Sequence, residues 1–301
     1  MATQPTAVLR GFSSMAARFS VLGVVGAGQM GSGIAQVAAT ASLDVILSDV
    51  DQRALDRGMQ TIKASLTKFV TKGTLGQEEA EKIMKRVQTT TTLEDFHSAD
   101  VVIEAVAENE ALKRRIFSEL DKIVAKEAIL ASNTSSISIT RIAAATQRPE
   151  RVIGMHFMNP VPLMKLVEIV RGIATDDAVF EDTKQLAHWL GKTVCCSKDY
   201  PGFIVNRVLM PMINEAFYAL YEGVASAQDI DLGMKLGTNQ PMGPLTLADF
   251  IGLDTCLAIM RVLHDGLGDS KYRPCPLLVQ YVDAGWLGKK VGKGVYNYSK
   301  L

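Results

Sequence analysis

The chain has 301 residues, 48% of them hydrophobic, and 32 basic residues balance 32 acidic ones. This length predicts two domains, and the hydrophobic content is enough for a sizeable core. The net charge of zero provides no global field to attract nucleic acid or an anionic membrane, although a local basic patch remains possible. No apolar run approaches the roughly 18 residues that span a membrane. We therefore expect a soluble globular protein with neither nucleic acid nor membrane as a partner.

Both ends of the chain resemble targeting signals. Residues 1–20 contain two arginines, several Ser and Ala and no acidic residue, a composition typical of a transit peptide for an organelle or of a disordered leader. The last three residues are Ser299-Lys300-Leu301, the tripeptide that the peroxisomal import receptor reads at a C-terminus. The tripeptide is specific to its position and the N-terminal composition is not. We therefore predict a peroxisomal location, with the mitochondrion as the alternative.

From Val21 onward, short apolar runs alternate with longer amphipathic segments. The runs predict strands at 21–25, 45–48, 101–106, 128–132, 152–157, 166–170 and 193–197. Helices are expected near 31–40, 52–72, 77–86, 110–124, 137–145 and 177–190. The first four strands are nearly apolar throughout, as a parallel sheet covered on both faces requires. The alternation therefore predicts a doubly wound, Rossmann-like α/β domain over residues 21–199.

The pattern changes after Tyr200-Pro201-Gly202, where only helical segments follow. They span 203–223, 227–237, 243–268 and 274–285, with glycines at their ends. The first is apolar on most faces, so it is either buried or part of a dimer interface, and Pro211 should bend it. We therefore predict an all-helical second domain at 200–301.

The first strand leads into a glycine-rich turn and then directly into a helix. Gly26, Gly28 and Gly31 form G-x-G-x-x-G, in which the glycines permit a tight turn, close approach of a pyrophosphate and close packing of the helix. The next strand ends at Asp49, where a carboxylate can bind the adenosine ribose and would repel a 2′-phosphate. This context predicts an NAD site, which also includes Gln29 and Met30 inside the motif. The alternative is a glycine turn without a ligand, with Asp49 as a helix cap.

The segment "HFMNPVPLMKLVE" places His156 and Glu168 on either side of a connection that contains two prolines. Pro160 and Pro162 lack the N–H groups that a helix or a central strand would use, so 158–163 should be irregular. His156 then ends one strand and Glu168 lies in the next, and antiparallel pairing could bring the side chains together. Such a pair suits removal of a proton from an alcohol during hydride transfer. The alternative is a histidine that serves only as a structural hydrogen-bonding group.

Further polar candidates follow an apolar strand and begin the second domain. Asn133, Ser135 and Ser136 lie at the sheet edge where open parallel sheets bind ligands, but they could equally cap the next helix. Asn206 lies in an apolar helix, where a buried amide needs partners. Structural hydrogen bonding would explain it as well. The cysteines, which include no C-x-x-C pair, are expected to be reduced thiols, and no metal site is predicted.

Several stretches together resemble the monofunctional L-3-hydroxyacyl-CoA dehydrogenases, which include the 3-hydroxybutyryl-CoA dehydrogenases. They are "GAGQMGSGIAQVAA", "VIEAVAEN", "LASNTSSISIT", "GMHFMNPVPLMKLVEIV", "DYPGFIVNRVLMPMINEA" and "MKLGTNQPMGPLTLADFIGLD". The resemblance runs from about residue 21 to residue 298, and the six stretches occur in the order and near the spacing of the family. It implies an NAD domain, a helical domain that builds much of a homodimer interface, and an acyl-CoA substrate.

The resemblance also implies roles for individual residues. His156 matches the general base of the family and Glu168 the acid that orients it, while Ser135 and Asn206 match residues that bind the substrate oxygen or the base. The positions that match cofactor contacts are Glu108, Lys113 and Asn159. On the helix after Asp49, Ser65 and Lys72 match contacts to CoA, and Lys68 lies one turn before Lys72. Without the resemblance, these lysines would be read as a solvated helix face.

The sequence therefore predicts oxidation of an L-3-hydroxyacyl-CoA to the 3-ketoacyl-CoA with NAD. One alternative is an enzyme of the same fold that acts on a free hydroxy acid or sugar acid and needs no CoA site. Another is a structural or regulatory protein that binds a dinucleotide without turnover. The acyl-chain preference depends on the volume of a pocket that the sequence does not define.

Overall fold

The computed structural model describes residues 19–298, in two compact units that divide between Asp199 and Tyr200. This is the place where Tyr200-Pro201-Gly202 predicts the change from the α/β domain to the helical domain. The leader was predicted over residues 1–20; its residues 1–18 and the C-terminal tripeptide lie outside the described residues. Phe19 and Ser20 belong to the first unit, because Phe19 is buried in its core and Ser20 N and Oγ donate to Asp100.

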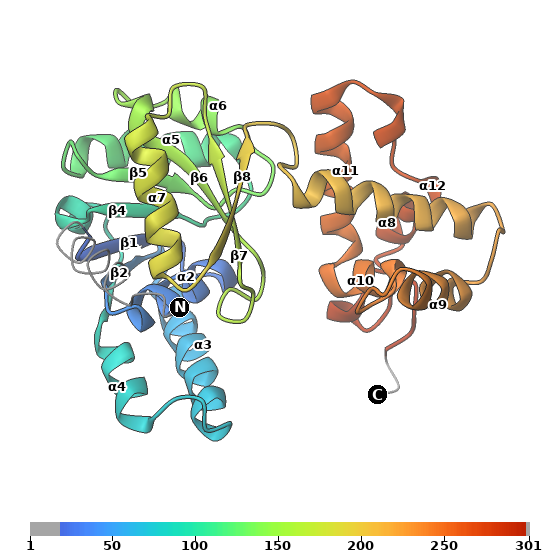
Figure 1. Ribbon diagram of the computed structural model, residues 1–301, viewed down its shortest axis with the longest axis horizontal. Coiled ribbons are helices and arrows are strands. Elements are labelled where there is room, and N and C mark those ends of the chain that lie inside the picture. Colours follow the sequence, from blue (N-terminus) through green and yellow to red (C-terminus); the bar gives the residue numbers. More distant parts are fainter. Residues whose placement is uncertain (1–18, 299–301) are drawn as a thin grey trace, which may run out of the picture. The chain divides into compact units, whose positions relative to one another are not determined.

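The first unit is built on one eight-stranded sheet with the order β3-β2-β1-β4-β5-β6-β7-β8 (Figure 1). The strands are β1 (Val21–Val25), β2 (Asp44–Ser48), β3 (Val87–Thr90), β4 (Val101–Glu104), β5 (Ile129–Ser132), β6 (Val152–Phe157), β7 (Leu166–Arg171) and β8 (Thr193–Lys198). All neighbours are parallel except β6 and β7. The predicted doubly wound fold is confirmed, with β3 as an edge strand that the apolar runs did not indicate.

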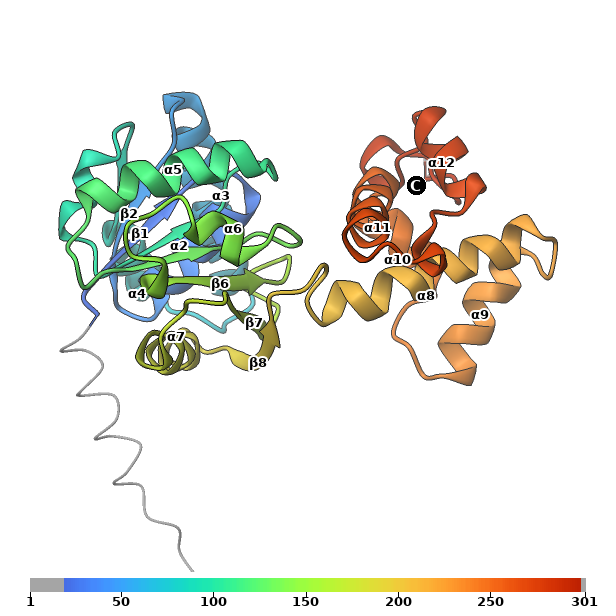
Figure 2. The same cartoon turned by 90° about the horizontal axis from the view of Figure 1, so that it is seen from above.

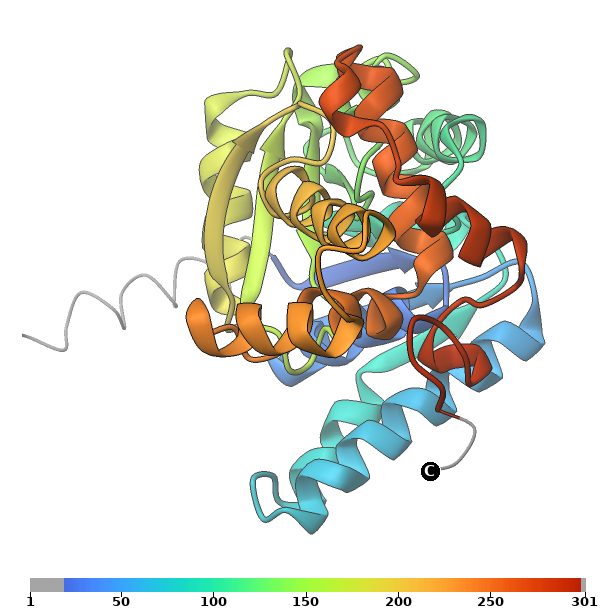
Figure 3. The ribbon, with the colours of Figure 1, turned by 90° about the vertical axis from the view of Figure 1, so that its right-hand side faces the viewer.

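Helices cover both faces of this sheet, as its buried central strands require. The helices are α2 (Gln29–Thr40), α3 (Gln52–Thr71), α4 (Gln77–Lys85), α5 (Glu110–Ile123), α6 (Ile139–Ala143) and α7 (Asp177–Trp189). Figure 2 shows α5 and α7 on opposite faces of the sheet. Apolar residues of α2, α3, α4 and α7 join those of the strands in one core cluster. Figures 1 and 3 show α3 and α4 side by side, extending together away from the sheet.

The connection between β6 and β7 reverses the chain direction within the sheet. Residues 158–165 form turns and irregular backbone, as the two prolines predict. The buried Lys192 donates from Nζ to the carbonyls of Val161 at 2.6 Å and Met164 at 2.9 Å. Burial lowers the pKa of Lys192. The backbone carbonyls of the connection thus satisfy a buried ammonium group, and the ammonium in turn holds the connection in place.

The second unit is built of helices, as predicted, and over its described residues the only β-pairing is two isolated bridges that join Gly288, Lys293 and Asn297. It contains α8 (Val205–Tyr221), α9 (Ala227–Gly237), α10 (Pro244–Ile251), α11 (Leu253–Leu267), α12 (Pro276–Asp283) and two short 3₁₀ turns, at Ser270–Tyr272 and Lys289–Val291. Pro211 lies inside α8. The predicted segment 243–268 is divided into two helices at Gly252, whose φ of 104° suits glycine. Buried Asp249 accepts hydrogen bonds from Val295 N and Tyr296 N and thereby ties the last described segment to α10.

The described residues contain neither a helix that could span a membrane nor a cluster of metal ligands. None of their helices combines the length and the low polarity that crossing a membrane would need. Between residues 19 and 298, no cluster of three or more His, Cys, Asp or Glu side chains could hold a metal ion. In the same range all four cysteines are free thiols, two of them buried.

Candidate active site

The turn between β1 and α2 is shaped by its glycines. Gly26 has a φ of 104°, and its N–H donates to the carbonyl of Ser48 at 2.7 Å. A Cβ on Gly31 would lie 1.7 Å from the carbonyl oxygen of Gly26, so close packing of helix and turn excludes any side chain there. Gly28 differs, because its φ is ordinary and a Cβ would meet nothing within 4 Å. The fold itself therefore requires Gly26 and Gly31 but not Gly28.

The start of α2 fits the phosphates of a dinucleotide. No side chain among the described residues caps this terminus, so its first N–H groups point outward from Gln29 and Met30. The carboxylate of Asp49 accepts from Ala27 N at 2.9 Å and so ties the end of β2 to the glycine turn. A second hydrogen bond runs from Asp51 N to the other carboxylate oxygen at 3.3 Å. Open space at Gly28, free helix N–H groups and a carboxylate at the next strand end together fit NAD.

His156 and Glu168 are direct partners in the sheet. The antiparallel register of β6 and β7 pairs the two residues, and His156 Nδ1 lies 2.6 Å from Glu168 Oε2. Glu168 is fully buried and His156 is 8% exposed. A carboxylate bound to Nδ1 favours the tautomer with its proton on that nitrogen, which makes Nε2 the basic nitrogen. The predicted pairing across the proline-containing connection is confirmed.

Two asparagines link this pair to neighbouring strand ends. Asn133, directly after β5, accepts through Oδ1 from Phe157 N at 2.9 Å and so joins the ends of β5 and β6. Asn159 accepts from Gln29 Nε2 at 3.1 Å, which brings the β6–β7 connection to the start of α2. The structure thus brings together two residues that were predicted separately for the cofactor site. The acid-base pair and the glycine turn therefore belong to one edge of one sheet.

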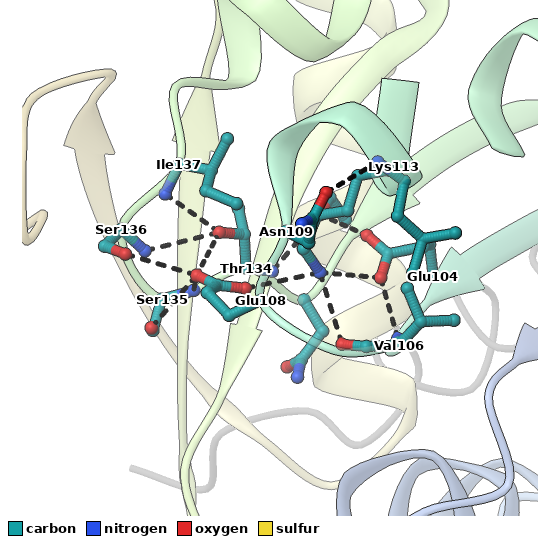
Figure 4. Close-up of polar contacts among 12 residues, drawn as sticks. Glu104, Val106, Glu108, Asn109, Lys113, Thr134, Ser135, Ser136 and Ile137 are labelled. Carbon is teal, nitrogen blue, oxygen red and sulfur yellow. Dashed lines mark hydrogen bonds and ion pairs between the residues drawn. The ribbon is translucent and has the colours of Figure 1, made fainter. Parts of the chain in front are cut away.

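Glu108 accepts several hydrogen bonds from the polar loop that follows β5 (Figure 4). Its Oε1 accepts from Thr134 Oγ1 at 2.6 Å, from Ser135 N at 3.0 Å and from the hydroxyls of Ser135 and Ser136, both at 3.2 Å. Burial alone would raise the pKa of Glu108, but the Lys113 ammonium and the hydrogen bonds lower it overall. The loop residues therefore surround an ionised carboxylate at neutral pH. The following helix is capped by Ser138, so capping does not explain Ser135 and Ser136.

Two buried groups next to this loop, Glu104 and Ser132, were not singled out from the sequence, whereas Lys113, which binds Glu104, was indicated by the family resemblance. Lys113 donates from Nζ to Glu104 Oε1 at 2.7 Å and forms an ion pair with Glu108 Oε2 at 3.3 Å. Ser132 donates to the other oxygen of Glu104 at 2.7 Å. Glu104 is the single acidic residue of the apolar run "VVIEAV", and a charge inside a buried strand was a signal that a partner must lie near. Lys192 was likewise not singled out.

The remaining predicted residues lie elsewhere in the two units. Ser65 and Lys68 lie on α3, and Lys72 is its C-cap. The spacing of three and four residues places them on one face of the helix. Within the described chain, neither lysine forms an ion pair with another residue. Asn206 is buried in the first turn of α8, in the second unit. Its predicted contact with the substrate or with His156 stays a prediction.

Comparisons with known proteins agree with this geometry. Residues 21–200 match the family model of the 3-hydroxyacyl-CoA dehydrogenase NAD binding domain, and residues 202–298 match that of the C-terminal domain. The chain belongs to the 3-hydroxyacyl-CoA dehydrogenase family. The family resemblance that the sequence motifs indicate is thus confirmed, and the first unit is an NAD-binding domain.

Individual relatives cover nearly the whole chain. A 3-hydroxybutyryl-CoA dehydrogenase of Bradyrhizobium diazoefficiens is 60% identical over 284 residues, which are 94% of this chain and 97% of that protein. The mitochondrial hydroxyacyl-coenzyme A dehydrogenase of Homo sapiens is 43% identical and covers 91% of this chain and 90% of its own. The crystal structure of (S)-3-hydroxybutyryl-CoA dehydrogenase from Ralstonia eutropha superimposes with a TM-score of 0.91 at 49% identity, covering 94% of this chain and all of that one.

Alanine at Gly28 should weaken cofactor binding without weakening the fold. Because the added methyl group meets open space in the protein, the Gly28→Ala variant should keep the melting temperature of the unaltered chain. The same methyl group would occupy the space that a pyrophosphate needs, so the Kd for NADH should rise at least about tenfold. Fluorescence titration with NADH and thermal melts measure the two effects. Gly31→Ala is the matched control that should lose stability, and unchanged NADH affinity in Gly28→Ala would contradict the assignment.

Proposed function

We propose that this protein oxidises L-3-hydroxyacyl-CoA, including 3-hydroxybutyryl-CoA, to the 3-ketoacyl-CoA with NAD. The observation that carries the proposal is the buried His156–Glu168 pair at 2.6 Å, on the sheet edge that also carries the glycine turn. The names of the similar enzymes support the substrate class. Such a reaction belongs to fatty-acid β-oxidation or related acyl-CoA metabolism.

The substrate loses a proton from its 3-hydroxyl oxygen and a hydride from C3. His156 takes the proton of the 3-hydroxyl at Nε2, and the negative charge of Glu168 stabilises the imidazolium that forms. As the O–H bond breaks, the carbonyl forms and the C3–H bond releases a hydride. Bound NAD supplies the hydride acceptor. Burial of the pair excludes water that would otherwise compete for the proton.

Ser135 and Asn206 are proposed to position the hydroxyl group that reacts. Ser135 lies in the loop that follows β5, and its hydroxyl donates to Glu108. Asn206 would contribute an amide from the start of α8. Glu108, Lys113 and Asn159 are proposed to line the cofactor side of the same site. Orientation of this kind can account for a large part of an enzymatic rate enhancement.

Substitution of the acid-base pair should abolish most turnover while the cofactor still binds. For His156→Gln, kcat should fall at least about 10² to 10⁴-fold, the usual contribution of a positioned general base. Glu168→Gln should also lower kcat, because the imidazolium loses its neutralising charge. Absorbance of NADH formed from L-3-hydroxybutyryl-CoA gives the rates, and NADH titration checks binding. The exposed His97→Gln is the control that should behave as the unaltered enzyme, and near-normal turnover in His156→Gln would refute the base assignment.

The same assay separates this function from its two alternatives. A dehydrogenase of free hydroxy acids would reduce NAD with 3-hydroxybutyrate and gain nothing from the thioester. A dinucleotide-binding structural protein would bind NADH and turn over neither compound. The proposed enzyme should turn over the CoA thioester and leave the free acid almost untouched. A buried base with a buried acid favours an enzyme, because burial of these groups has a cost that binding alone does not offset.

Ser65, Lys68 and Lys72 are proposed to contact the CoA part of the substrate. Removal of both ammonium groups in Lys68→Ala/Lys72→Ala should raise KM for the CoA thioester about tenfold, since two exposed charge pairs together are worth roughly that much. The value of kcat should change little, because the nucleotide phosphates of CoA, which the lysines are proposed to contact, are far along the molecule from the reacting C3 atom. Lys63→Ala, on the opposite side of α3, is the matched control. Equal KM values for the double variant and the control would exclude this helix face.

We further propose that the protein forms a homodimer through its helical unit. Apolar side chains lie exposed on this unit when one chain is considered by itself, among them Val208 (68%) on α8 and Leu236 (72%) on α9. The proposal is that these side chains form one apolar patch, which is typical of an interface. Sedimentation equilibrium should give twice the chain mass of 32.6 kDa. A mass of one chain at micromolar concentration would contradict the proposal.

A peroxisomal address is proposed for Ser299-Lys300-Leu301, with the import receptor as partner. The tripeptide supports this location, and the composition of residues 1–20 supports the mitochondrial alternative. Cell fractionation of the chain with and without residues 299–301 separates the two. Loss of peroxisomal enzyme on removal of the tripeptide is the expected result. Unchanged recovery in mitochondria would favour the N-terminal signal.

A further inference from the structure

Glu104 is a buried carboxylate that the proposed reaction does not use. It ends β4 and has no exposed surface. Its Oε1 accepts from Lys113 Nζ and from Val106 N, each at 2.7 Å, and its Oε2 accepts from Ser132 Oγ at 2.7 Å. Burial of a carboxylate is costly unless several donors surround it. These three short contacts fix both oxygens of Glu104 between the ends of β4 and β5.

Lys113 connects this buried carboxylate to the candidate site. Its side chain rises from α5, is 1% exposed and lies between Glu104 Oε1 at 2.7 Å and Glu108 Oε2 at 3.3 Å. The carbonyl of Val106 is a third acceptor at 3.5 Å. The Lys113 ammonium therefore contacts two carboxylates, and its contact with the buried Glu104 is the shorter one. Figure 4 shows Lys113 in this position between the two glutamates.

Glu108 is the outer end of this chain of charges. Its side chain is 39% exposed, and Oε2 faces Lys113 while Oε1 accepts from the loop that contains Thr134, Ser135 and Ser136. If Glu104 were neutral, the ammonium would no longer be drawn inward and would move toward Glu108. The carboxylate would then be drawn to the ammonium and away from the loop. The orientation of the Ser135 hydroxyl thus depends on the charge of Glu104, which acts through Lys113 and Glu108.

We propose that Glu104 is a positioning residue for the dehydrogenase reaction, because it holds Lys113 where that ammonium fixes Glu108 against the hydroxyl of Ser135. This inference rests on the proposed function and assigns Glu104 no contact with substrate or cofactor. Small displacements of groups that orient a substrate cost large factors in rate. The competing explanation is that Glu104 and Lys113 form a buried ion pair that serves stability alone.

Charge-removing variants distinguish positioning from stability. Glu104→Gln keeps the shape of the side chain and should lower kcat for L-3-hydroxybutyryl-CoA about 10 to 100-fold. Lys113→Met leaves Glu104 buried without its counter-charge, so both the melting temperature and kcat should fall. In Glu104→Gln/Lys113→Met the unpaired buried charge is gone and the melting temperature should recover. The value of kcat should stay low, because Glu108 still lacks the ammonium that fixes it.

A buried ion pair on the same helix provides the matched control. Asp121 Oδ1 on α5 lies 2.6 Å from Arg148 Nε and plays no part in the loop around Ser135. Asp121→Asn should lower the melting temperature and leave kcat within about twofold, as loss of a purely structural pair does.

Each result bears on one of two questions. Turnover by the unaltered chain tests the proposed function, and its absence would remove both the function and the inference. With that turnover present, normal kcat in Glu104→Gln, or recovery of kcat together with the melting temperature in the double variant, would overturn the positioning role alone. The supporting result is a low kcat in Glu104→Gln, which keeps Lys113, together with a Kd for NADH like that of the unaltered chain.

Discussion

The antiparallel pairing of β6 and β7 is the constraint on which the candidate site depends. The other neighbouring strands of the sheet are parallel, so consecutive strands reach the same edge only after a helical crossover. A direct reversal after Phe157 instead places His156 opposite Glu168 within a single connection. Lys192, bonded to two carbonyls of that connection, keeps the reversal in place. The base and its acid are thus fixed by backbone register before any ligand is involved.

Two strands of the sheet, β4 and β7, each carry a buried carboxylate that has a partner side chain. Glu168 on β7 is matched by His156, and Glu104 on β4 by Lys113, each at hydrogen-bond distance. The other residues of β4 are apolar, as are those of β7 except Arg171 at its end, so each buried carboxylate is stabilised by its partner side chain rather than by water. In each pair, the contact with the partner offsets the cost of burying the carboxylate and fixes the orientation of both side chains.

The fold class and much of the candidate site could be predicted from the sequence, because they depend on local patterns of apolar residues, glycines and prolines. Apolar runs gave seven of the strands, and prolines between His156 and Glu168 required the turn that brings them together. Polar β3 was missed because an edge strand needs no apolar run. The hydrogen bond between Gln29 and Asn159 could not be predicted, because it joins residues 130 positions apart. Glu104 was not predicted because its partner, Lys113, lies on a helix, and no fixed sequence spacing relates a strand residue to such a partner.

The last strand of the sheet places an uncharged side chain next to Glu168. In the parallel register of β7 and β8, Cys195 stands opposite Glu168 on the side away from the histidine. Burial and then the negative charge of Glu168 raise the pKa of this thiol, so it stays protonated and neutral at physiological pH. A lysine or arginine at position 195 would compete for the carboxylate and weaken its hold on Nδ1. A neutral thiol leaves the charge directed toward the imidazole, where a developing positive charge needs it most.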